Sequence, residues 1–400
     1  MVPAAQILQA MKGMKTLRSG RNRRKWIYVL LLMGLLGLSG CGSPSSASVE
    51  MSSQTELVKK GSMELQYAEN FAVDYYEDGY KMLTTLPDSK RYLLVPEGQP
   101  VPRGLDEDVS ILQEPLQNIY LVASGVMDMF ASLDAVDQIR FSGQKQENWY
   151  IQTAKDAMAA GDMIYAGKYS KPDYELLVSE GCDLAIENRM ITHSPEVVEM
   201  LQSFDIPVMI EYSSYEQHPL GKVEWVKFFG ALTGKEVEAE ETFAEQTEIL
   251  EKVESGEKTG KTIAFFYVTS NGLIQVRQST DYIPKLIELA GGRYIFEDLE
   301  DSGSGRSTLN MQVEDFYAGA KDADILIYNS SIDGGVNTID ELIGKCNILK
   351  DFKAVQDGQV YCTTNDMYQQ SMAIGYLLQD MHTVLTDDDT AKLRYLFLLQ

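Results

Sequence analysis

Histidine and cysteine are scarce in this sequence, with three and four copies among 400 residues. A dedicated zinc or manganese site usually combines several histidines with carboxylates. His193, His218 and His382 stand far apart, and the sequence has no histidine-rich loop. This scarcity argues against a receptor for a bare metal ion, and it predicts no metal site and no cofactor of the protein's own.

The cysteines also lack the CxxC spacing of redox and zinc motifs. Cys346 and Cys362 could form a disulfide in an oxidising compartment, but this pairing would leave Cys182 over. We therefore expect these three residues to be buried or free thiols, and the disulfide stays open as the alternative.

Motifs of the common enzyme classes are missing. The sequence contains no G-x-S-x-G, no H-E-x-x-H, no Walker A motif and no G-x-G-x-x-G after a strand. Carboxylates are plentiful, but no spacing pairs an acid with a base. We expect a protein that is not an enzyme, with a lipid-anchored hydrolase as a remote alternative.

Basic residues are in deficit over the whole chain but concentrated at its start. Seven precede position 40 with no acid among them: Lys12, Lys15, Arg18, Arg21, Arg23, Arg24 and Lys25. An apolar run from Trp26 to Leu38 follows, which is too short for a stable membrane span of ~20 residues. A basic segment, a short apolar run and small residues are typical of a secretory signal. We predict a signal peptide over residues 1–40, with an uncleaved anchor as the alternative and Met11 or Met14 as possible starts.

Cys41 follows Leu38-Ser39-Gly40 directly, and this motif resembles the bacterial lipobox. The resemblance implies that the Cys41 thiol is diacylated and becomes the new N-terminus. Two or three acyl chains anchor a protein stably, whereas one binds only marginally. We therefore expect a lipid-anchored protein on the extracytoplasmic face of the cell membrane.

The charge of the remaining chain restricts its partners. The net charge is −24 at pH 7, and loss of the seven basic residues of the signal makes it about −31. Such a chain will not bind nucleic acid or an anionic membrane through charge. It suits a partner with basic docking residues or a cationic ligand, although solubility outside the cell explains most of the charge.

The chain after Cys41 divides by composition and by pattern. The stretch 41–62 is rich in Ser, with Gly and Pro, which predicts a flexible tether. The remaining length, about 340 residues, suggests two domains. We expect an N-terminal α/β lobe over 63–220, a connecting region with one long interlobe helix over 221–258, and a C-terminal α/β lobe over 259–400.

Short apolar runs alternate with helical stretches along both lobes, which favours βαβ units and mostly parallel sheets flanked by helices. The predicted strands are Asn118–Ser124, Asp183–Glu187, Ile206–Glu211, Thr262–Val268, Ala323–Tyr328 and Gln359–Cys362. The predicted helices are Val126–Leu133, Tyr174–Val178, Val197–Phe204, Ala239–Glu254, Tyr282–Ala290, Val313–Ala320 and Tyr368–Leu385. Ala239–Glu254 is the expected interlobe helix.

From Gln117 to the C-terminus, the chain resembles the substrate-binding proteins of ABC importers whose two lobes are bridged by one rigid helix. Two stretches carry the resemblance best: Lys171–Glu175 leading into Cys182–Glu187, and Pro219-Leu220-Gly221 through Gly230 and Gly234 into the long helix. The match continues over Ile287–Tyr294 (IELAGGRY), Gln312–Ile327 and Leu349–Val360 (LKDFKAVQDGQV). Cys182 and Ala323 stand where this family usually has a proline before its Asp-apolar strands. The resemblance implies delivery of a ferric siderophore, haem or cobalamin to a permease and ATPase complex by a monomeric receptor. A cell-surface sensor or adhesin with the same fold is the alternative.

Ligands of open parallel α/β sheets bind beyond the carboxyl ends of the strands. The loops that follow the predicted strands should therefore line one cleft between the lobes. From these loops we select five ligand-binding candidates, whose rings suit a flat chelate and whose guanidinium groups suit its oxygens: Trp149, Arg189, Tyr212, Arg277 and Tyr368. Ser124, Asn188, Ser270, Asn329 and Thr363 occupy similar positions.

The family resemblance also implies a docking pair. One glutamate on each lobe meets arginines of the permease in this family, and these positions fall on Glu175 and Glu314. Each stands early in a predicted helix, where a carboxylate is also stabilised by the helix dipole.

Overall fold

The computed structural model describes residues 57–299, 307–330, 335–387 and 390–400. The described residues belong to one compact unit. The predicted signal peptide, Cys41 and most of the predicted tether lie outside the described residues. Within the described ranges, no helix is both long enough and apolar enough to cross a membrane.

The first lobe is built on a five-stranded, fully parallel sheet of order β12-β11-β6-β7-β8. Its strands are Ile119–Leu121 (β6), Ile139–Ser142 (β7), Ile164–Tyr165 (β8), Leu184–Asn188 (β11) and Val208–Glu211 (β12). Successive side chains point to opposite faces, so Ile119 and Leu121 enter one core while Tyr120 enters the other. Helices α2 (Val126–Ser132) and α3 (Gln152–Ala160) join the first of these cores, and α4 (Tyr174–Glu180) and α5 (Pro195–Ser203) the second.

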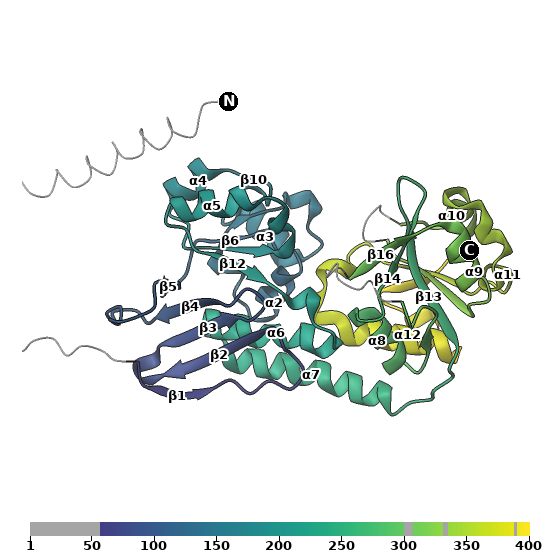
Figure 1. Cartoon of the computed structure of the whole chain (residues 1–400), viewed down its shortest axis with the longest axis horizontal. Coiled ribbons are helices and arrows are strands. Elements are labelled where there is room, and N and C mark those ends of the chain that lie inside the picture. The colour runs from purple at the N-terminus through teal and green to yellow at the C-terminus, as the bar shows by residue number, and fades with distance from the viewer. Residues whose placement is uncertain (1–56, 300–306, 331–334, 388–389) are drawn as a thin grey trace, which may run out of the picture. The chain divides into compact units, whose positions relative to one another are not determined.

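A second sheet precedes this lobe in the chain. It has the order β1-β2-β3-β4-β5, antiparallel except for the β4–β5 pair (Figure 1). Its strands are Lys59–Ser62 (β1), Phe71–Tyr76 (β2), Lys81–Thr85 (β3), Lys90–Val95 (β4) and Val109–Gln113 (β5). The sequence did not predict this sheet, and β1 lies in the stretch expected to be tether, so that tether ends earlier than expected.

Two consecutive helices follow the first lobe, where we expected one. Helix α6 (Pro219–Thr233) ends at Gly234, whose φ of +72° suits a glycine, and α7 (Glu236–Glu254) then runs back along it. Every residue of α6 except Thr233 is buried, whereas α7 has an exposed face. Helix α7 also contacts α12 (Ile374–Thr386) of the second lobe, so the predicted interlobe helix exists but is paired with a buried one (Figure 1).

The second lobe holds a seven-stranded mixed sheet of order β16-β14-β13-β17-β18-β19, with β15 paired to β13. Strands β13, β15, β17 and β18 are parallel, and the others are antiparallel. The strands are Thr262–Val268 (β13), Ile274–Arg277 (β14), Arg293–Tyr294 (β15), Thr308–Met311 (β16), Ile325–Tyr328 (β17), Val360–Thr363 (β18) and Leu396–Leu398 (β19). The main helices beside α12 are Tyr282–Leu289 (α8), Val313–Ala320 (α9), Ile339–Lys345 (α10) and Lys353–Gln356 (α11). The predicted two-lobed α/β fold is confirmed.

Candidate functional site between the lobes

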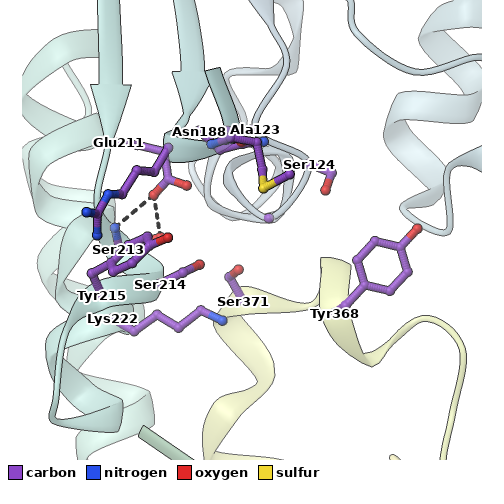
Figure 2. Close-up of a pocket in the computed structure, with 13 residues that line it drawn as sticks. Ala123, Ser124, Asn188, Glu211, Ser213, Ser214, Tyr215, Lys222, Tyr368 and Ser371 are labelled. Atoms are coloured by element: carbon purple, nitrogen blue, oxygen red, sulfur yellow. Dashed lines mark hydrogen bonds between the residues drawn. The ribbon is translucent and has the colours of Figure 1, made fainter. Parts of the chain in front are cut away.

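The carboxyl ends of three parallel strands of the first lobe open into one pocket of about 260 Å³. Residues directly after β6, β11 and β12 form most of its wall, as the general rule for open parallel sheets predicts. The lining consists of Ala123, Ser124, Gly125, Asn188, Arg189, Met190, Glu211, Ser213, Ser214, Tyr215, Lys222, Tyr368 and Ser371 (Figure 2).

Tyr368 and Ser371 complete the pocket from the second lobe, in the two short 3₁₀ turns that precede α12. Hydrogen bonds hold these turns against the first lobe. The backbone N–H of Met372 donates to Asp128 Oδ2 at 2.7 Å, and the buried Gln369 side chain bonds to the backbone of Asn148 and Tyr150, both at 2.8 Å. The pocket is therefore a true interlobe site.

The charged side chains of the lining are Arg189, Glu211 and Lys222. The Arg189 guanidinium lies 4.6 Å from the Tyr215 ring centre, in a cation–π contact. Glu211 Oε2 accepts hydrogen bonds from the backbone N–H and the hydroxyl of Ser213, at 2.8 and 2.6 Å. Burial raises the pKa of the Glu211 carboxyl, and the hydrogen bonds from Ser213 and the charge of Lys222 oppose this rise. Lys222 provides the second cation of the lining.

Two of the five predicted ligand-binding residues line this pocket. Arg189 follows β11, and Tyr368 faces it from the second lobe with 36 % of its surface exposed. Ser124 and Asn188, which also follow predicted strands, are part of the same wall.

Trp149 and Tyr212 lie in the core instead. Only 1 % of Trp149 is exposed, and its indole N–H donates to Ser142 Oγ at 3.1 Å. Tyr212 is 6 % exposed and contacts the pocket residue Tyr215 edge-on. Burial also raises the pKa of the Tyr212 hydroxyl. Neither residue lines the pocket, which corrects the sequence-based expectation.

Arg277 is also outside the pocket. Its guanidinium Nη1 lies 3.4 Å from Asp281 Oδ2, and it borders a separate cavity of about 10 Å³ in the second lobe. This cavity is too small for a solute, so the structure assigns Arg277 to an internal ion pair. Arg277 is the last residue of β14, a strand that the sequence did not predict, and β14 runs antiparallel to β13, so its end lies away from the carboxyl ends of the parallel strands.

The sequence missed several residues of the pocket, above all Lys222, Tyr215 and Ser371. A signal for Lys222 existed. Lys222, Glu224 and Lys227 interrupt an otherwise apolar helix, and charged residues without a polar face to occupy must be buried with partners or serve a site. Ser371 gives no comparable signal, because only the contact between the lobes brings it to the pocket.

Glu175 and Glu314 are exposed in the first turns of α4 and α9. Of the described cysteines, none forms a disulfide, so Cys346 and Cys362 are not joined. Burial raises the pKa of the Cys182 thiol to about 12, which keeps it protonated. In the described part of the chain, no group of three or more His, Cys, Asp or Glu side chains is placed to hold a metal ion.

Comparison with known proteins places this geometry in context. No family model matches the chain. An uncharacterized lipoprotein of Methanocaldococcus jannaschii is 24 % identical over 396 residues, which cover 90 % of this chain and 92 % of the relative. A second uncharacterized lipoprotein of that organism is 23 % identical and covers 86 % and 90 %.

Solved structures show the same arrangement of lobes. A periplasmic haem-binding protein of Vibrio cholerae superposes with a TM-score of 0.53 at 15 % identity, over 67 % of this chain and 98 % of that one. An Fe³⁺-hydroxamate transport protein of Saccharomonospora viridis gives 0.53 at 17 %, over 68 % and 93 %. A possible iron-binding, periplasmic solute-binding protein of Staphylococcus epidermidis gives 0.52 at 17 %, over 67 % and 98 %.

The chain has the two-lobed fold of these periplasmic binding proteins. Its pocket lies between the lobes at the carboxyl ends of the first lobe's parallel strands, where such a fold places a solute. About a third of this chain lies outside the match.

A buried carboxyl precedes the pocket residue Asn188 in the chain. Glu187 is fully buried on β11, one residue before Asn188, and neither of its carboxyl oxygens has a hydrogen-bond partner among the described residues. Burial raises the pKa of Glu187 to about 8, so the folded protein keeps this group protonated at neutral pH.

Substitution of Glu187 by Gln should flatten the dependence of stability on pH. The unfolded chain loses the Glu187 proton near pH 4.5 and the folded chain only near 8, so folding stability falls as pH rises between these values. The loss is roughly 1.4 kcal/mol per pH unit, or about 4 kcal/mol from pH 5 to pH 8. Urea unfolding of both proteins at pH 5 and pH 8 measures it. Equal pH dependence in the two proteins would show that Glu187 is ionised in the fold.

Proposed function

We propose that this chain is a lipid-anchored solute-binding protein that captures an iron complex outside the cell and delivers it to an ABC permease and ATPase. The observation that carries the proposal is the pocket walled by both lobes, within a fold shared with periplasmic binding proteins. A ferric siderophore is the first candidate ligand, haem the second and cobalamin the third. The iron would arrive with the donor atoms of its own chelate.

Attachment to the membrane would depend on the lipid alone. The lipobox-like Cys41 and the naming of two relatives as lipoproteins support an acyl anchor at this residue. The tether that follows would hold a monomeric receptor within reach of the permease. Palmitate is the acyl chain we expect.

One methionine of the pocket supports haem as the second candidate ligand. Met127, Met129 and Met163 are fully buried in the core and cannot reach a ligand. Met190, by contrast, lines the pocket and has 50 % of its surface exposed. A thioether can serve as an axial ligand of haem iron, so Met190 is the residue that would bind haem if haem is the cargo.

A thermal-shift screen of the chain from Gly42 onward tests the proposal. The panel holds ferric catecholate and hydroxamate complexes, ferric citrate, haem, cobalamin, free divalent metals, sugars and amino acids. A ligand at ~100 times its Kd stabilises the fold by about 2.7 kcal/mol, which raises Tm by several degrees. We expect a shift with one class of iron complex.

Two variants test whether a rise in Tm comes from ligand bound in the pocket. Ser214→Trp places a bulky side chain at an exposed position of the lining and should abolish the shift. Ser179→Trp makes the same change at an exposed position of α4 and should preserve it. No shift with any iron complex would contradict the proposal and favour a sensor or adhesin.

Charge reversal of the docking pair should separate transport from binding. We expect Glu175→Lys combined with Glu314→Lys to abolish uptake of the iron complex by iron-limited cells, because the reversed charges would repel arginines of the permease. Affinity for the ligand should stay unchanged, since both residues are exposed and neither lines the pocket.

The matched control reverses two other exposed acids in first turns of helices, Glu196 of α5 and Asp340 of α10, and should leave uptake intact. Normal uptake by the Glu175/Glu314 variant would contradict the docking assignment.

A further inference from the structure

Lys222 is a buried cation that points into the pocket. It is 8 % exposed, it lines the pocket, and its ammonium lies 4.6 Å from the ring centre of Tyr282 on α8. Figure 2 shows its side chain extending from α6 toward Ser371. Within the described ranges, no hydrogen-bond acceptor or carboxylate oxygen lies within bonding distance of the Lys222 Nζ atom.

Lys227, the other buried lysine of α6, is paired with carboxylates inside the fold. Lys227 Nζ lies 3.5 Å from Glu224 and 2.9 Å from Glu240. Burial of an ammonium is costly unless it is paired. Lys227 meets this requirement inside the fold, and Lys222 does not.

Three carboxylates near Lys222 interact with its charge but form no hydrogen bond or ion pair with it. Lys222 opposes the burial-driven rise in the pKa values of Glu211, Asp128 and Asp281. Each of the three accepts other hydrogen bonds: Glu211 from Ser213, Asp128 from Met372, and Asp281 from Ile283 and Arg277. They stabilise the cation at a distance and leave its donors directed at the pocket.

A second donor of the same wall also lacks a partner. Ser371 is 2 % exposed, and its hydroxyl has no hydrogen-bond partner among the described residues. With Arg189, the lining then holds two cations against one acid, Glu211. The lining thus carries more cations than acids, although the whole chain has 59 acidic and 35 basic residues.

We propose that the pocket selects its ligand by a negatively charged oxygen group that accepts hydrogen bonds from Lys222 Nζ and Ser371 Oγ, with Arg189 as a second cation. The inference rests on the proposed function and specifies its substrate class. The cargo is an anionic iron chelate with carboxylate or phenolate oxygens, in preference to a neutral hydroxamate complex or an apolar macrocycle. A volume of about 260 Å³ lies just below the range of roughly 300–1,000 Å³ for pockets that hold drug-sized ligands, and it suits a compact chelate.

Isothermal titration calorimetry on the full chain in detergent tests this selection with three probes: ferric citrate, citrate without iron, and a neutral ferric trihydroxamate. We expect ferric citrate to bind and the neutral complex to bind at least tenfold more weakly. Lys222→Met keeps the length of the side chain and removes its charge. It should weaken ferric citrate roughly 10- to 100-fold, the effect of losing a hydrogen bond to a charged group, and Ser371→Ala should weaken it several-fold.

Melting temperatures of the unliganded variants separate a binding role from a structural one. Lys222→Met should lower Tm less than Lys227→Met does, because Lys222 has no hydrogen-bonded or ion-paired partner in the described fold and loses only its contact with the Tyr282 ring and its longer-range attraction to nearby carboxylates. Lys227→Met is the matched control: it should lower Tm by removing the ion-pair partner of the buried Glu224, while ferric citrate affinity stays unchanged.

Each contrary result has a distinct meaning. Tighter binding of the neutral complex would overturn the inference and leave the proposed function intact. Equal binding of citrate with and without iron would support the anion site and contradict the iron cargo. Binding of none of the probes would overturn the inference, and the wider ligand screen would then decide the function. A fall in Tm for Lys222→Met as large as that for Lys227→Met, with unchanged ferric citrate affinity, would assign Lys222 to the fold.

Discussion

The burial of helix α6 is the constraint on which the rest of the structure depends. Glu224 on this helix accepts backbone N–H bonds from Gln66, Tyr67 and Ala68 at 2.8–3.1 Å, and so ties the chain before β2 to the helix. The same helix packs on α7, α2 and α8 and brings Lys222 to the pocket. One element therefore joins the N-terminal sheet, both lobes and the site.

The sequence predicted several strands of both lobes and helix α7, but it did not predict helix α6 or the N-terminal sheet. Each strand predicted in the two lobes corresponds to one in the structure, because a buried parallel strand is a short apolar run between turn residues. The amphipathic helix α7 was predicted within three residues of its start, whereas α6 has no exposed face and so no apolar period to detect. The N-terminal sheet lay outside the resemblance and was not predicted.

The site could be predicted only as far as topology determines it. Arg189, Ser124 and Asn188 follow parallel strands, and the general rule for such sheets was enough to find them. Trp149 and Tyr212 satisfied the same rule but turn into the core, because an aromatic ring near a sheet edge packs wherever apolar neighbours are available. Lys222 and Ser371 depend on contacts between segments far apart in the chain, which no local pattern encodes.

The central claim is that the interlobe pocket holds the iron complex. Crystals of the protein grown with the complex that raises its Tm, measured at the iron absorption edge, test this claim most directly. The account predicts one strong anomalous peak inside the pocket, between Arg189 and Lys222 and facing Tyr368. Iron bound elsewhere, for example beside Arg277 in the second lobe, or a pocket without iron in such crystals, would contradict it.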